Sequence, residues 1–84
     1  MNDYDTMNLR QAVAQSRTTD SIAHVVLSVP TPAEDILVHL EGMVSEGEES
    51  DWTTNGDTLE FWAFDPECER SDEMTMRVHV SPIK

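Results

Sequence analysis

Apolar residues occupy every second position in two stretches of the chain, 21–29 and 73–80, and this period is typical of β-strands. The first stretch is rich in valine, and its other side also carries Ile22 and Val26. Because both sides of this strand carry apolar residues, we expect it to lie in the centre of a sheet. Polar residues fill the intervening positions of the second stretch, which predicts a strand with one buried face that ends at Pro82.

Residues 32–46 have a different period, with apolar residues three and four positions apart, and this predicts an amphipathic helix. Three signals mark its beginning: Thr31 as the N-cap, Pro32 at the first helical position, and Glu34 completing a capping box. Gly47 is available for the left-handed turn that commonly follows a helix. The expected buried stripe consists of Ile36, Leu37, Leu40, Met43 and Val44.

Residues 50–54 and 57–64 form a β-hairpin in this interpretation. They flank Asn55-Gly56, which is the strongest short signal for a two-residue type I′ turn. This turn predicts a register that places Asp51 opposite Glu60, and two like charges in that position oppose folding.

The aromatic residues of the hairpin fall on both of its faces. Trp52 shares the expected core face with Leu59, whereas Trp62 and Phe64 fall on the opposite face. These two side chains either form a second small core under the N-terminal segment or belong to a binding patch.

Residues 1–20 predict a short helix over 6–16, with Leu9 and Val13 on one face and Thr6 or Asn8 as its N-cap. Such a short helix is marginal alone, so this segment either docks on the domain or folds only on a partner. Residues 17–20 read as a loop.

Together these elements predict one α+β domain over residues 1–84. An antiparallel sheet of about four strands (21–29, 50–54, 57–64 and 73–80) is covered on one face by helix 32–46, with the short N-terminal helix in addition. The length of 84 residues leaves no room for a second domain.

The net charge of −12 excludes several kinds of partner. Five lysines and arginines cannot neutralise a phosphate backbone, and an anionic membrane would repel the chain, so direct binding of nucleic acid or membrane is not expected. The first residues are acidic and polar, unlike a signal peptide, and the single cysteine agrees with a reducing compartment. We therefore expect a cytoplasmic protein.

Motifs that carry catalysis or bind metals and cofactors are missing from the sequence. It contains no phosphate-binding glycine loop, no paired cysteines, no His-x-x-x-His and no EF-hand loop, and its three histidines are scattered singly. We expect no metal, no cofactor and no enzymatic activity.

Acidic side chains are concentrated between Glu46 and Glu73, where eleven of them accompany a single base, Arg70. Carboxylates at strand and helix spacings resemble the phosphates of one nucleic-acid strand, so this surface can compete for a basic groove. The hypothesis is a non-enzymatic inhibitor that mimics nucleic acid and blocks the basic surface of a DNA- or RNA-binding complex. Small acidic inhibitors of restriction and CRISPR complexes from phages and plasmids are analogous in size and charge. The expected contacts are Glu46, Glu48, Glu49, Asp51, Glu60, Asp65, Glu67, Glu69 and Asp72.

Two alternatives explain the same charge. Adaptation to high salt would account for seventeen acidic residues and one lysine, but it should spread them over the whole surface. An interaction module of a larger assembly would instead use a strand edge, or Trp62 and Phe64, with the charge incidental. Salt separates these hypotheses: a mimic loses its partner as salt rises, an aromatic anchor does not, and a salt-adapted protein unfolds when salt is removed.

Overall fold

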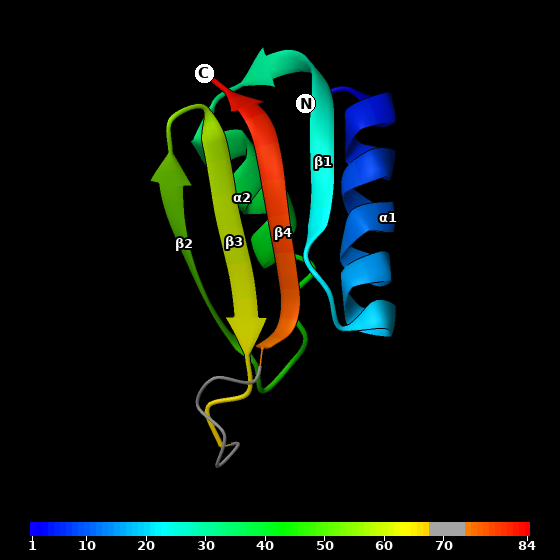
Figure 1. Cartoon of the computed structure of the whole chain (residues 1–84), viewed down its shortest axis with the longest axis vertical. Coiled ribbons are helices and arrows are strands. Elements are labelled where there is room, and N and C mark those ends of the chain that lie inside the picture. The colour runs from blue at the N-terminus through cyan, green and yellow to red at the C-terminus, as the bar shows by residue number, and fades with distance from the viewer. Residues whose placement is uncertain (68–73) are drawn as a thin grey trace.

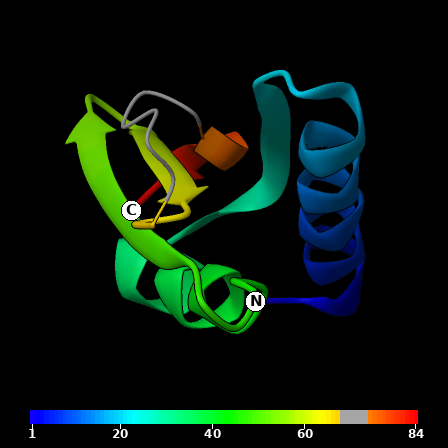
Figure 2. The same cartoon turned by 90° about the horizontal axis from the view of Figure 1, so that it is seen from below.

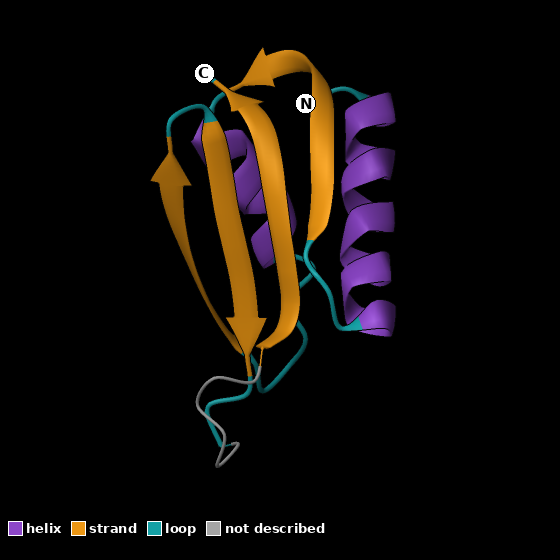
Figure 3. Cartoon of the chain, in the orientation of Figure 1, coloured by secondary structure: helices purple, strands orange, loops and turns teal. Residues whose placement is uncertain are grey.

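A computed structural model describes residues 1–67 and 74–84 of the chain. In the described residues, two helices accompany four strands, which form one sheet (Figures 1 and 3). The strand order is β1-β4-β3-β2, with β1 parallel to β4 and the other neighbours antiparallel. The predicted α+β domain is confirmed, with a mainly antiparallel sheet. The elements are α1 (Asp3–Thr19), β1 (Ala23–Thr31), α2 (Ala33–Glu41), β2 (Glu49–Asn55), β3 (Thr58–Phe64) and β4 (Met74–Ile83).

The hydrophobic core lies between one face of the sheet and the two helices. Val78 of β4 pairs with Ala23 of β1 on one side and Phe61 of β3 on the other, so alternate residues of the three strands share this face. Leu9 of α1 and Leu40 of α2 are fully buried in the same cluster. The opposite face, which we call the open face, has no helix over it among the described elements.

Helix α1 is longer than the sequence predicted and is attached to the domain. It begins after Asn2, whose side chain accepts a hydrogen bond from the Asp5 amide at 2.7 Å, so Thr6 and Asn8 are not its caps. Asp5 is only 1% exposed and accepts hydrogen bonds from the backbone N–H and the hydroxyl of Ser28 in β1. Residues 17–19 continue the helix, so the prediction of a loop there was wrong.

Strand β1 lies at one edge of the sheet and not in its centre (Figure 1). The apolar residues on its second side, which suggested a central strand, stay exposed: Val26 is 76% exposed. Strand β4 is in the centre instead, paired with β1 and β3, and it continues past Pro82 to Ile83, beyond its predicted end.

Helix α2 is shorter than residues 32–46. Its N-cap residue is Pro32, whose side chain has no group that can cap the helix, and the Thr31 hydroxyl donates to the Val29 carbonyl at 2.9 Å. The predicted capping box is therefore wrong. The helix ends at Glu41, and Gly47 adopts its positive φ of 89° in the following connection.

The β2–β3 hairpin forms, but its turn is displaced by one residue. The central residues are Gly56 and Asp57, and only Gly56 has a positive φ, 63°, which is the pattern of a type II′ turn. Asn55 therefore pairs with Thr58. This shift moves each cross-strand partner by two positions and leaves every side chain on its predicted face.

The new register removes the predicted repulsion between carboxylates. Asp51 lies opposite Trp62, and Glu60 lies opposite Thr53 on one side and His79 of β4 on the other. Trp52 lies on the helix side, as predicted, opposite Phe61.

Candidate interaction surface

Four exposed carboxylates come together at one end of the sheet. Glu49, the first residue of β2, pairs with Phe64, the last residue of β3. The connection into β2 therefore ends beside the point where the connection out of β3 begins (lower part of Figure 1). These connections carry Glu46, Asp65 and Glu67, all exposed. We call Glu46, Glu49, Asp65 and Glu67 the acidic end.

Glu48, in the same region, has a structural role. Arg17 of α1 donates to both of its carboxylate oxygens, at 3.0 and 2.8 Å, and also to the Met43 carbonyl at 3.1 Å. The Ser45 amide donates to Glu48 at 2.8 Å. These contacts tie α1 to the connection between α2 and β2, and they leave the Glu48 side chain only 10% exposed.

The same contacts stabilise the charged form of Glu48. Chiefly because of the Arg17 hydrogen bonds, and against the effect of burial, the pKa of Glu48 falls from its ordinary 4.5 to about 2. The nearby Thr75 hydroxyl also lowers this pKa, although its oxygen is buried without a well-formed hydrogen bond to a described residue. The pKa of Arg17 rises in turn, chiefly through its bond to Glu48. Glu48 is thus a poor candidate for a partner contact.

The remaining predicted contacts do not all join the acidic end. Asp51 is exposed on the open-face side of β2, and its carboxylate accepts a hydrogen bond from the Trp52 amide at 2.8 Å. Glu60 is half-buried in the middle of the open face, 3.3 Å from Nε2 of His79. Glu69 and Asp72 lie outside the described residues.

The open face carries a row of polar side chains across three strands that the sequence analysis did not assemble. His24 pairs in register with His79, and their rings meet edge to face with centroids 5.1 Å apart. Glu60 continues this row on β3. Alternation placed all three residues on one side of their strands, but only the strand order and register show that they are neighbours.

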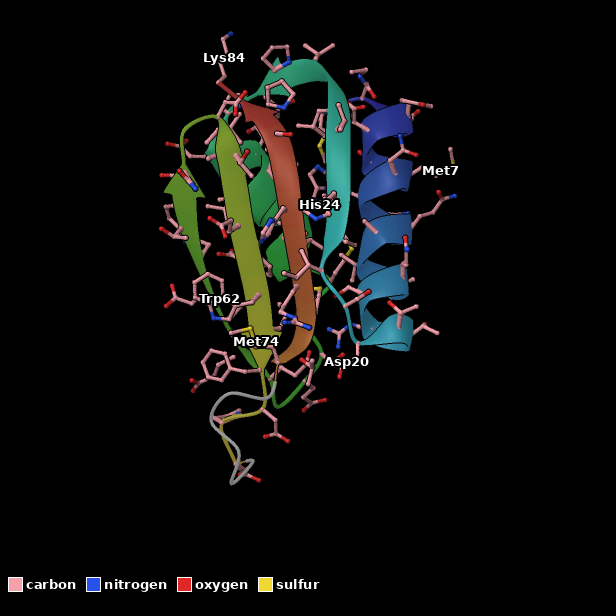
Figure 4. All side chains as sticks on the ribbon, viewed as in Figure 1. Met7, Asp20, His24, Trp62, Met74 and Lys84 are labelled. Atoms are coloured by element: carbon pink, nitrogen blue, oxygen red, sulfur yellow. The ribbon has the colours of Figure 1, made fainter. Side chains whose placement is uncertain are left out.

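Trp62 lies on the open face beside this row and is half-buried (Figure 4). Together with Ile22, Met74 and Arg77 it lines a shallow pocket of about 290 Å³. The prediction of a second core under the N-terminal segment was wrong, because α1 packs in the core on the other face of the sheet.

Strand β2 forms the opposite edge of the sheet from β1 and pairs with β3 alone. All seven of its residues are exposed. Trp52 is 45% exposed even though it faces the helix side, because none of the described strands lies beyond β2. Figure 2 shows β2 at the far side of the sheet from α1.

The described residues contain neither a metal-binding cluster nor a helix that could cross a membrane. Within residues 1–67 and 74–84, no group of three or more His, Cys, Asp or Glu side chains is arranged to hold a metal ion. In the same residues, no helix combines the length and the apolar character that crossing a membrane requires.

Comparison of the chain with protein-family models, with curated proteins and with solved structures gave no match in any of the three.

Proposed function

We propose that this protein is a non-enzymatic inhibitor that acts in the cytoplasm, where its acidic end occupies the basic nucleic-acid-binding surface of a partner complex. A restriction or CRISPR complex is the kind of target that this mode of action suits. The observation that carries the proposal is the convergence of four exposed carboxylates, three from two connections and one from the start of β2, at one end of the sheet.

Two features of the acidic end support binding over a merely solubilising role. Arg17, which reaches this region from α1, is already bound to Glu48, so it does not neutralise the exposed carboxylates. The charges are also held by ordered elements, since Glu49 belongs to the sheet and the Asp65 carboxylate accepts the Glu67 amide at 2.9 Å. A preorganised array loses less conformational entropy on binding than flexible side chains on a disordered tail.

The test compares two variants that change the net charge equally. Glu46→Lys, Glu49→Lys and Glu67→Lys together reverse the acidic end and bring the net charge from −12 to −6. The control variant makes the same change in net charge with Glu34→Lys, Asp35→Lys and Asp57→Lys. These residues lie at the other end of the molecule, where α2 begins and the Asp57 carbonyl accepts a hydrogen bond from the Ile83 amide. Circular dichroism first establishes that both variants are folded.

Tagged protein is then used to capture partners from host lysate at low and high salt. We expect a nucleic-acid-binding complex to be captured at low salt and released at high salt. The acidic-end variant should lose this complex, and the control variant should keep it. Equal loss of the complex in both variants would show that overall charge, and not the acidic end, is responsible, and full capture by the acidic-end variant would contradict the proposal.

An interaction module is the second candidate, and the open face supports it. Trp62, Ile22 and Arg77 surround a shallow pocket there, and aromatic and arginine side chains are common anchors in protein interfaces. Capture that resists salt and is lost in Trp62→Ala would favour this function over inhibition by charge.

A further inference from the structure

The two edges of the sheet differ in how they are protected. At the β1 edge, α1 lies alongside the strand, and its Asp5 side chain accepts the Ser28 backbone N–H at 3.0 Å. At the β2 edge, no described element lies beyond the strand (Figure 1). An uncovered edge presents unpaired N–H and C=O groups that can pair with another extended chain.

The register identifies which backbone groups face outward. Asn55 and Thr58 flank a two-residue turn, so they form a hydrogen-bonded pair, and the pattern alternates from there. Ser50, Trp52 and Thr54 therefore direct their N–H and C=O groups away from β3. The Trp52 amide agrees with this direction, since it donates to the carboxylate of its neighbour Asp51 and to no strand.

The side chains of β2 place negative charge on one side of this edge and an aromatic ring on the other. Glu49 and Asp51 project on the open-face side, whereas Trp52 projects on the helix side and leaves 45% of its surface exposed. A strand lying beside β2 would meet two carboxylates on one side and an indole ring on the other.

We propose that the partner adds an extended segment to β2 as a fifth strand, with lysine or arginine on its open-face side and an apolar residue beside Trp52. This inference rests on the proposed function and specifies how the basic partner is held. Backbone pairing supplies a directional contact, while Glu49 and Asp51 select for positive charge. A second copy of this chain is a poor occupant, because two molecules of charge −12 repel each other.

The probe is a synthetic peptide as long as β2, Lys-Thr-Lys-Ile-Lys-Thr-Lys, with blocked ends. Its sequence reads the same in both directions, so the isoleucine lies beside Trp52 in either strand orientation. The protein carries Trp62→Phe, which leaves Trp52 as its only tryptophan. We expect saturable binding, a blue shift of Trp52 emission, and slower amide exchange at Ser50, Trp52 and Thr54.

A matched peptide, N-methylated at every residue, keeps every charge but cannot donate backbone hydrogen bonds to β2 in either strand orientation. We expect it to bind at least about tenfold more weakly, because three hydrogen bonds are lost. On the protein, Thr54→Pro removes one outward N–H at an edge position that tolerates proline, whereas Thr54→Ala keeps it. Only the proline variant should weaken binding of the unmethylated peptide.

The outcomes separate this inference from the proposed function. Equal affinity of the two peptides would overturn strand addition and leave charge-driven inhibition standing. Absence of peptide binding, or dimerisation of the protein through β2 in sedimentation experiments, would also overturn it. Peptide binding by strand addition, together with partner capture that survives reversal of the acidic end, would instead overturn the proposed function alone.

Discussion

Replacing Glu48 by glutamine tests the ion pair that joins α1 to the connection before β2. The substitution keeps the shape of the side chain and removes its charge. The difference between a pKa of 4.5 and one of about 2 corresponds to about 3 kcal/mol of stability at neutral pH. Because Arg17 is 27% exposed, solvent screens part of this interaction, and we expect a loss of about 2 kcal/mol. For a domain of this size the Tm should fall by roughly 8–15 °C.

The pH dependence of this loss follows from the direction of the pKa change. The folded state holds the pKa of Glu48 below its unfolded value, so the contribution is complete above about pH 5 and disappears as the pH falls toward 2. The difference between wild type and Glu48→Gln should therefore shrink to under about half by pH 3. Urea denaturation followed by circular dichroism at pH 7, 5, 4 and 3 measures it.

The neighbouring Glu49→Gln is the control, because Glu49 is exposed and makes no side-chain hydrogen bond to a described residue. It should change stability by less than about 0.5 kcal/mol at every pH. The stabilising role of the Arg17–Glu48 pair is refuted if Glu48→Gln is as stable as wild type at pH 7, or if its loss of stability is as large at pH 3 as at pH 7.

Three further substitutions probe the scaffold that holds these surfaces. Asp5→Ala removes the acceptor for the Ser28 amide and hydroxyl, and it should lower the free energy of unfolding in urea by about 1–3 kcal/mol. The exposed Asp3→Ala should lower it by under about 1 kcal/mol, and similar losses for both would contradict the role of Asp5. Leu40→Ala, at a fully buried position, should cost about 2–5 kcal/mol in the same assay, and a loss under 1 kcal/mol would show that the cluster repacks. Gly56→Ala places a side chain at a φ of 63° and should lower the Tm by several degrees; an unchanged Tm would mean that the turn adopts another form.

The sequence predicted which side chains are buried better than it predicted which residues are paired. Leu59 lies in the core as expected, because alternation alone assigns a face. The opposition of Asp51 and Glu60 was wrong, because Asn55-Gly56 and Gly56-Asp57 both permit a two-residue turn and the choice between them moves every partner.

The candidate surface was predictable only in part for the same reason. Exposure of Glu46 and Glu49 follows from their polarity, but the burial of Glu48 depends on Arg17, which approaches from a helix far away in the sequence. The open edge of β2 depends on strand order, which periodicity does not encode. Parallel pairing of β1 with β4 likewise depends on contacts between distant segments.

The central position of β4 has a consequence for how the chain reaches this structure. β4 follows the other described strands in the sequence, yet it is the only one of them that pairs with β1. During synthesis, the apolar faces of β1 and the helices stay exposed until β4 is available, while the β2–β3 hairpin can already form from local contacts. Completion of the sheet then requires insertion of β4 between β1 and β3, so folding should be a cooperative event that begins only when the residues of β4 are available.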